Sequence, residues 1–275
     1  MNRSKNFLCV LWFRETLFSL VCKVRYLKGE RVAMPTHPIF WLSLPLLALV
    51  GCTPVSTPTP HRTEKIRIAL AGDSTVTEES GWGAGFKKCL TGEVECLNFS
   101  RGGRSSKSFT DEGHWAKCIE SKPNYILIQF GHNDQPGKGP TRETDPNTTY
   151  RENMSRYVDE ARNIGAQPIL VTSLSRRRWQ LDGRISTPNQ QPYIDVVRKI
   201  AAEKKVPLID LYALSIAKYE ELGKEKCFEI SPKDSKGGWD GTHLNPKGSG
   251  IFGQMMAEEL KKTVPDLAPV IQAPK

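Results

Sequence analysis

Two short motifs contain the serine, histidine and carboxylate that a nucleophilic hydrolase site requires. Gly72-Asp73-Ser74-Thr75 offers a hydroxyl in a tight turn, and Asp240-Gly241-Thr242-His243 offers an imidazole three residues after a carboxylate. A carboxylate at that spacing can orient the imidazole, which then acts as a general base toward a serine. Alone, the first motif favours an ordinary turn in which the serine caps a helix, and the simpler interpretation of the second is a surface turn with a solvated histidine.

Two further motifs contain donors that can stabilise an oxyanion. Ser100-Arg101-Gly102-Gly103-Arg104-Ser105 contains glycines, which let a backbone N–H approach a ligand closely. Gly131-His132-Asn133-Asp134 adds an asparagine amide, a good donor to developing negative charge. The simpler interpretations are a flexible loop for the first motif and a Gly-Asx turn for the second.

The elements that must position these motifs follow from the hydrophobic pattern. Short apolar runs of this kind suit strands that are covered on both faces, and their alternation with helical patterns predicts an α/β fold with a parallel sheet. The predicted strands cover residues 66–72, 94–99, 125–131, 168–173 and 206–212, and the clearest predicted helices cover residues 150–163, 192–204 and 246–263.

The motifs share one place in this predicted fold. Three of them directly follow the first three strands, and the fourth begins the last helix. Because the carboxyl ends of parallel strands meet at one edge of the sheet, we expect Ser74, Gly103, Asn133, Asp240 and His243 to converge there. Together they predict a serine esterase that needs no metal and no organic cofactor. A P-loop or dinucleotide site is disfavoured, because neither glycine fingerprint follows the first strand.

The order of these blocks resembles that of the SGNH (GDSL-type) hydrolases. The resemblance runs from about Ile66 to Thr263 and implies a three-layer α/β/α sandwich with a five-stranded parallel sheet, a flavodoxin-like arrangement. It also implies roles for particular residues. Ser74 matches the nucleophile, and its N–H matches one oxyanion donor. Gly103 and Asn133 match the further oxyanion donors. Asp240 and His243 match the acid and the base.

The closer resemblance is to rhamnogalacturonan acetylesterases and related pectin acetylesterases. It rests on Gly-Asp-Ser-Thr, Gly-Gly-Arg-Ser-Ser, Phe-Gly-His-Asn-Asp and Asp-Gly-Thr-His-Leu-Asn. This implies an enzyme that removes acetyl groups from acetylated pectic polysaccharide through an acyl-enzyme. A lipase, thioesterase or xylan acetylesterase on the same scaffold is the alternative, because a fold does not fix a substrate. A non-catalytic carbohydrate-binding lipoprotein is disfavoured, since binding alone does not need the three triad residues.

Several residues near the predicted site have side chains suited to an acidic polysaccharide. Arg104 and the arginine run 176–178 can form a basic rim that attracts carboxylates, although a solvated loop explains the run equally well. Trp179 and Trp239 can stack on sugar rings or serve as partly buried packing residues. We expect Arg104, Trp179 and Trp239 to contact substrate.

The N-terminal region predicts an exported protein. The apolar run 39–50 is too short to span a bilayer and is typical of a signal peptide. It leads into Leu49-Val50-Gly51-Cys52, which resembles a bacterial lipobox with Cys52 as the lipidated residue. We therefore divide this region into a leader, 1–51, and a Thr/Pro-rich tether, 52–64. The prediction is a bacterial lipoprotein anchored in a membrane, in the periplasm or at the cell surface, with translation beginning at Met1 or Met34.

The charge of the chain argues against a nucleic-acid partner. The net charge is +9, and seven basic and two acidic residues in 1–51 leave only +4 for the remainder. That remainder lacks a clustered basic stripe, but it is compatible with an acidic polymer as substrate. We expect a monomer whose partners are acetylated polysaccharide and, through the lipid anchor, a membrane.

The cysteines after Cys52 and the last residues complete the predicted organisation. Cys89, Cys96, Cys118 and Cys227 allow three full pairings in an oxidising compartment. The pair Cys89–Cys96 is favoured, because a helix end and the next strand could bring these two together. The hydrolase domain is predicted to cover residues 65–264, and residues 265–275, with three prolines, are predicted to form a C-terminal tail.

Overall fold

A single five-stranded parallel sheet organises the part of the chain that the structure, a computed structural model, describes, residues 64–274. The strand order is β2-β1-β3-β4-β5, and every pairing is parallel. This confirms the predicted sheet. The strands are β1 (Ile66–Gly72), β2 (Val94–Asn98), β3 (Tyr125–Gln129), β4 (Gln167–Val171) and β5 (Leu208–Ile209).

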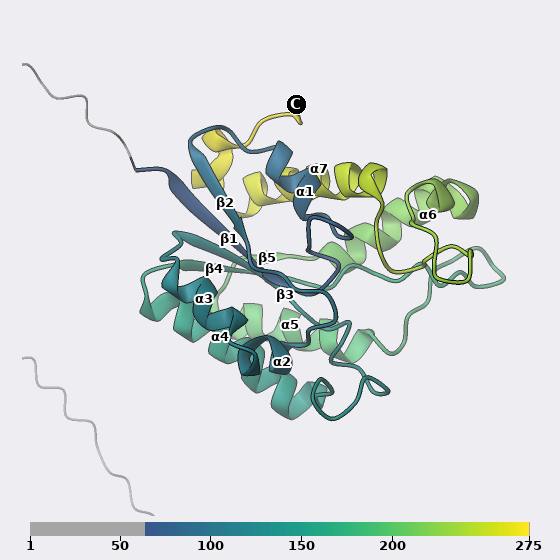
Figure 1. Ribbon diagram of the computed structural model, residues 1–275, viewed down its shortest axis with the longest axis horizontal. Helices are drawn as coiled ribbons and strands as arrows, with labels where there is room; N and C mark the ends of the chain where they lie inside the picture. Colours follow the sequence, from purple (N-terminus) through teal and green to yellow (C-terminus); the bar gives the residue numbers. More distant parts are fainter. Residues whose placement is uncertain (1–63, 275) are drawn as a thin grey trace, which may run out of the picture. The chain divides into compact units, whose positions relative to one another are not determined.

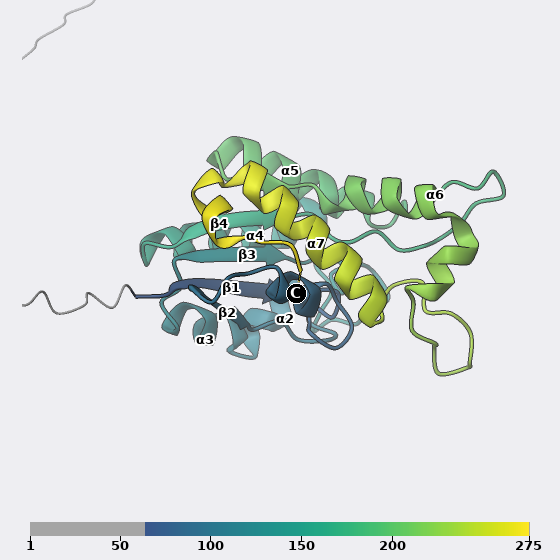
Figure 2. The same cartoon turned by 90° about the horizontal axis from the view of Figure 1, so that it is seen from above.

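Helices cover both faces of the sheet, which confirms the three-layer α/β/α arrangement (Figure 1). One layer contains α1 (Gly83–Lys88), α6 (Leu211–Glu229) and α7 (Pro246–Thr263). The other contains α2 (Ser106–Asp111), α3 (His114–Glu120), α4 (Arg151–Asn163) and α5 (Gln191–Lys204), with the π-helical turn Pro146–Tyr150 before α4. Figure 2 shows α7 crossing over the strands.

The sequence of the interior strand β1 shows that both faces of the sheet are covered. In β1, Ile68 and Leu70 point into one hydrophobic core, and Ala69 and Ala71 point into the other. Successive side chains of a strand alternate between its two faces. Since all four are completely buried, both faces of β1 are covered. Burying a large aliphatic side chain stabilises the fold by about 1.5–3 kcal/mol. The continuous apolar runs are therefore the signature of a sheet without a solvent-facing side.

The last strand is shorter than predicted. Residues 206–212 were expected to form it, but β5 covers only Leu208–Ile209. Asp210 ends the strand, because its side chain accepts a hydrogen bond from the Ala213 N–H and caps α6. The same carboxylate accepts hydrogen bonds from the hydroxyl of Thr172, directly after β4, and from Arg198. A single capping residue thus turns an apolar run from strand into helix.

The predicted C-terminal tail is wrong for the residues that the structure describes. Pro265–Val270 form a 3₁₀ helix, and Leu267, Val270 and Ile271 are buried in the core that α1 and α7 share. The Gln272 N–H donates to the Cys89 carbonyl oxygen at 2.8 Å. These apolar contacts outweigh the helix-breaking prolines, so the domain continues past residue 264.

The favoured disulfide is also not formed. Cys89, Cys96, Cys118 and Cys227 are all free thiols. The Cys89 side chain instead donates to the Gly85 carbonyl oxygen within α1, at 3.4 Å. Burial raises the pKa of Cys96 to about 12, so this thiol stays protonated.

The leader, the tether up to residue 63 and the lipidation residue Cys52 lie outside the described residues. Within residues 64–274, none of the helices combines the length and apolar character needed to cross a membrane.

Candidate active site

The order of the strands brings the first three motifs together. β1 lies between β2 and β3, with Leu70 paired to Asn98 on one side and to Leu127 on the other. Because the three strands are parallel, the loops that follow them emerge side by side at the carboxyl edge of the sheet. These loops carry Ser74, the Gly102–Gly103 pair and Asn133.

Ser74 lies in a tightly held turn at the end of β1. Asp73 Oδ1 accepts hydrogen bonds from the Thr75 N–H (2.9 Å) and the Thr75 hydroxyl (2.8 Å). Gln129 of β3 donates to Thr75 Oγ1 at 2.7 Å. Gly72 is needed here, because a Cβ at that position would lie 2.9 Å from the Gln129 carbonyl oxygen. The turn therefore presents Ser74, half-buried, at a fixed place on the sheet edge.

The loop before α7 brings the other two side chains to this serine. His243 Nε2 lies 2.8 Å from Ser74 Oγ, and His243 Nδ1 lies 2.6 Å from Asp240 Oδ2. Asp240 Oδ1 accepts the N–H groups of Thr242 at 2.6 Å and of His243 at 3.0 Å. The three side chains form one hydrogen-bonded series, in which the imidazole can accept the hydroxyl proton.

The surroundings of Asp240 keep it ionised. Partial burial raises the pKa of this carboxyl group, but hydrogen bonds from the His243 ring, the His243 N–H and the Thr242 N–H outweigh burial. The pKa of Asp240 is therefore held below its ordinary value. An ionised carboxylate keeps the proton of His243 on Nδ1 and leaves Nε2 free to accept one.

The glycine loop lies beside Ser74, and Asn133 is hydrogen-bonded to that loop. Gly103 has a φ of +77°, a left-handed conformation that favours glycine. A Cβ at Gly102 would lie 3.8 Å from the Ser74 Cβ, so this loop passes directly by the serine. Asn133 Nδ2 uses one N–H on the Arg104 carbonyl oxygen at 3.1 Å, and its second N–H remains for a ligand. The choice of Gly103 over Gly102 as donor stays a prediction.

A buried carboxylate joins the two donor loops. Asp134 Oδ1 accepts hydrogen bonds from the Ser106 N–H (3.0 Å), the Ser106 hydroxyl (2.6 Å) and the Thr144 hydroxyl (3.0 Å). Burial raises the pKa of Asp134 to about 7, and the hydrogen bonds from Ser106 and Thr144 oppose that rise. Since Ser106 follows the glycine loop and Asp134 follows Asn133, these bonds fix the two loops relative to each other.

Replacing Asn133 by alanine should lower kcat on p-nitrophenyl acetate by about 10²–10³-fold, or about 3–4 kcal/mol of transition-state stabilisation. The expected cause is loss of one donor to the oxyanion. Asn147→Ala is the matched control, because Asn147 is exposed in the π-helical turn before α4. Steady-state kinetics check both variants. A loss of less than threefold for Asn133→Ala would remove this residue from the oxyanion site.

Only part of the arginine run after β4 is free to contribute to the basic rim considered from the sequence. Arg177 is buried and donates to the carbonyl oxygens of Asp240, at 2.8 Å, and His243. Arg176 is half-buried and donates to the His132 carbonyl oxygen at 3.1 Å. Arg178 is the one exposed member of the run. Sequence could not reveal this, because adjacent arginines give no sign of which one faces inward.

Arg177 thus clamps the loop that carries Asp240 and His243. Replacing it by methionine leaves two carbonyl oxygens without their donor, and each such buried group costs about 1–3 kcal/mol. We expect a loss of about 3 kcal/mol in the free energy of unfolding, measured by urea denaturation, together with reduced kcat. Arg184 is exposed and lies, like Arg177, in the loop after β4. The free energy of unfolding of Arg184→Met should stay within about 0.5 kcal/mol of the wild-type value. Equal stability of the two variants would rule out the clamp.

The other predicted substrate contacts have mixed surroundings. Arg104 is paired with Glu112 at 2.8 Å, and Trp179 packs partly buried against the core. Trp239 is 47% exposed, directly precedes Asp240, and stacks on Phe228 with ring centroids 5.5 Å apart. Trp239 is therefore the predicted aromatic residue whose ring is most available to a sugar.

His132 contributes no accessible imidazole to this site. It is buried, and its Nε2 lies 2.7 Å from the Leu174 carbonyl oxygen. Burial lowers its pKa to about 4, so the ring is neutral. Across residues 64–274, no group of three or more His, Cys, Asp or Glu side chains is arranged to hold a metal ion.

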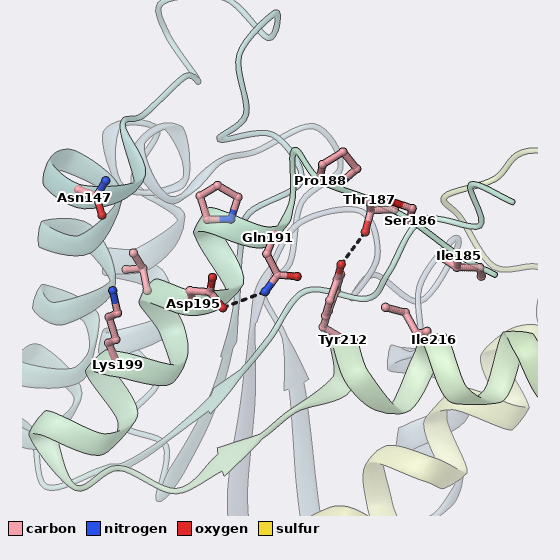
Figure 3. A pocket seen from close by; sticks show the side chains of 12 residues that line it. Asn147, Ile185, Ser186, Thr187, Pro188, Gln191, Asp195, Lys199, Tyr212 and Ile216 are labelled. Atoms are coloured by element: carbon pink, nitrogen blue, oxygen red, sulfur yellow. Dashed lines mark hydrogen bonds between the residues drawn. The ribbon is translucent and has the colours of Figure 1, made fainter. Parts of the chain in front are cut away.

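A separate pocket of about 670 Å³ lies beside α5 and α6 (Figure 3). Its walls include Gln191, which donates to Asp195 at 2.8 Å, and Thr187, whose hydroxyl lies 2.7 Å from that of Tyr212. None of the three hydrogen-bonded residues Ser74, His243 and Asp240 lines it. The candidate active site therefore lies outside this pocket.

A parallel α/β/α sandwich with a hydrogen-bonded serine, histidine and aspartate at its carboxyl edge has the architecture of a serine hydrolase. The sequence model of the GDSL-like lipase/acylhydrolase family matches residues 69–251. The chain belongs to this family, and it is a carboxylic ester hydrolase.

Two curated relatives agree with this assignment, and a solved structure has a similar fold. The chain is 35% identical over 214 residues to rhamnogalacturonan acetylesterase RhgT of Bacillus subtilis, covering 72% of this chain and 90% of RhgT. It is 34% identical to the probable rhamnogalacturonan acetylesterase YesY of the same organism, covering 71% and 92% of the two chains. The fold is similar to that of an acetylxylan esterase from Geobacillus stearothermophilus, with a TM-score of 0.55 and 17% identity over 71% and 94% of the two chains.

Proposed function

We propose that the protein is a serine carbohydrate esterase that removes acetyl groups from acetylated pectic polysaccharide, in the manner of a rhamnogalacturonan acetylesterase. The observation that carries the proposal is the hydrogen-bonded series from Ser74 through His243 to Asp240, in a chain that covers 90% of a named rhamnogalacturonan acetylesterase. Similarity over nearly the whole relative makes a shared substrate class the best-supported choice within the family.

In the first half of the proposed reaction, His243 Nε2 takes the proton of Ser74 as its oxygen attacks the acetyl carbonyl carbon. The carbonyl oxygen becomes an oxyanion, which accepts hydrogen bonds from the N–H groups of Ser74 and Gly103 and from the Asn133 amide. His243 then gives its proton to the departing sugar oxygen. The products of this half are a free sugar hydroxyl and an acetylated Ser74.

The second half repeats the steps with water. His243 removes a proton from the water molecule, whose oxygen attacks the acetyl-enzyme carbonyl. The same donors stabilise the second oxyanion, and the proton returns to Ser74 Oγ as acetate leaves. Asp240 stays ionised throughout and stabilises the imidazolium that forms in each half.

Acetate release from several polymers tests the proposed substrate. Equal acetyl concentrations of acetylated rhamnogalacturonan, acetylated homogalacturonan and acetylated xylan should be compared, with long-chain aryl esters as a lipase control. We expect the highest kcat/KM on acetylated rhamnogalacturonan. A preference for xylan would instead assign the protein to the acetylxylan esterases, and a preference for long acyl chains would favour a lipase.

The proposed location is a bacterial membrane, with a lipid anchor on Cys52. The lipobox-like sequence before this residue and the Thr/Pro-rich segment after it support the proposal. Cys52→Ser should move the protein from the membrane fraction to the soluble fraction on cell fractionation. Unchanged membrane association of this variant would contradict the anchor.

A further inference from the structure

The loop between β3 and α4 carries two cations to the rim of the candidate active site. Arg142 Nη1 lies 3.8 Å from the position that a Cβ would take at Gly103. Arg142 Nε donates to the Lys138 carbonyl oxygen at 2.9 Å, which holds the two residues in one turn. Both are half-buried, so their positions are defined by the protein. Nothing in the spacing of these residues indicated from sequence that they belong to the site.

These cations lack acidic partners. Among residues 64–274, no carboxylate lies within 4 Å of the charged groups of Lys138, Arg142, Arg176 or Arg178. Glu143, the acidic residue of the same loop, accepts the Gly139 N–H at 2.6 Å instead. Of the four, Arg176 is influenced by nearby carboxylates, those of Asp73 and Asp240, which raise its pKa against the effect of burial.

The four cations also lie close enough to repel one another. The pKa of Lys138 is lowered, first by burial and then by the positive charges of Arg176, Arg142 and Arg178. Arg176 is the inner member of the group, because it is hydrogen-bonded to the loop that carries the histidine of the site, through Thr242 Oγ1 at 3.3 Å. Gathered like charges of this kind focus a positive potential, and a bound anion relieves their repulsion.

We propose that Lys138 and Arg142 form a carboxylate-binding subsite for an acidic sugar residue adjacent to the acetylated sugar. The inference rests on the proposed function and names the feature of the polymer that the site recognises. A uronate carboxylate can form ion pairs with these two side chains, whereas a neutral xylan backbone has no negative charge to pair with them. Because Arg142 reaches the glycine loop beside Ser74, an anion bound there lies close to the reacting ester.

Competition in the p-nitrophenyl acetate assay tests the subsite. The competing ligands are unacetylated galacturonate oligomers, with xylo-oligosaccharides as neutral counterparts. The wild type should be inhibited by the galacturonate oligomers, and less so at high salt. In the double variant Lys138→Gln/Arg142→Gln, the inhibition constant for these oligomers should rise by about tenfold or more, while that for the neutral oligomers should not change.

The matched control is Lys65→Gln/Lys122→Gln. It removes the same charge from exposed positions at the amino ends of the strands, on the opposite edge of the sheet. Its inhibition constant for the galacturonate oligomers should equal that of the wild type. An unchanged constant in the Lys138/Arg142 variant, or an equal rise in the control, overturns the subsite.

The outcome can be separated from that of the proposed function. The competing oligomers carry no acetyl groups, so their binding does not depend on which acetylated polymer is hydrolysed. Poor acetate release from acetylated rhamnogalacturonan would overturn the proposed function, even if the oligomers still bind through Lys138 and Arg142. Normal acetate release combined with an unaltered inhibition constant in the variant would overturn the subsite alone.

Discussion

Replacing Ser74 by alanine is expected to lower kcat on p-nitrophenyl acetate by about 10⁴–10⁶-fold. The variant keeps His243, Asp240 and the oxyanion donors, but it has no oxygen that can form the acyl-enzyme. Removal of the nucleophile from a serine protease triad has an effect of this size, because the remaining groups then act without their partner. The residual rate should reflect stabilisation of the oxyanion alone, with water as the attacking group.

The fold should tolerate this change. Ser74 is half-buried, and the turn around it is held by Asp73, Thr75 and Gln129, not by its own hydroxyl. The midpoint of thermal unfolding should therefore stay within a few degrees of the wild type. Ser80→Ala is the matched control, because the Ser80 hydroxyl donates to the Ser74 carbonyl oxygen at 3.0 Å in the same turn. Its activity should fall less than tenfold, and comparable losses in both variants would indicate a structural cause.

Asp240→Asn is expected to lower kcat by about 10⁴-fold, since the corresponding change in a serine protease has that effect. An amide nitrogen facing His243 Nδ1 donates a hydrogen bond instead of accepting one. The ring then holds its proton on Nε2, where it can no longer accept the proton of Ser74. Because Oδ1 still accepts the N–H groups of Thr242 and His243, the loop should keep its shape.

The pH dependence of stability should separate Asp240 from its neighbours. Its pKa lies below the ordinary value, so the ionised group stabilises the folded state above the unfolded pKa of about 4. That contribution is lost as pH falls through the folded pKa, and Asp240→Asn should remove this part of the acid destabilisation.

Asp234→Asn, in the exposed part of the same loop, is the control for the loss of kcat and should retain near-normal kcat. Equal kcat losses for the two variants would argue against a special role for Asp240.

Much of the fold could be predicted from the sequence, because local pattern and tertiary environment agree in most elements. The continuous apolar run of β1 fits a strand that is covered on both faces, and α7 covers the predicted residues 246–263. Asn245 caps this helix by accepting the Gly248 N–H, and Pro246 occupies its first turn. The prediction failed where tertiary contacts determine the local structure. In residues 265–274 the prolines suggested a tail, but apolar side chains of this segment pack into the core.

The residues of the candidate site could be predicted where the topology of the sheet determines their position. Residues that follow successive parallel strands must emerge at one edge, so the placement of Ser74 and Asn133 follows from topology. The roles of Arg177 and Arg142 could not be predicted in this way. One is buried under the loop of Asp240, and the other reaches the glycine loop from a segment of irregular structure. Such long side chains act at positions far from their own backbone, which spacing along the chain does not reveal.

Covalent labelling of the intact protein with a fluorophosphonate, followed by peptide mapping, shows directly which residue is the nucleophile. We expect one adduct per chain, located on Ser74, and its loss in His243→Ala, since attack on phosphorus needs the same activated oxygen. Labelling at a different residue, or full esterase activity in a preparation that takes up no label, would contradict Ser74 as the nucleophile.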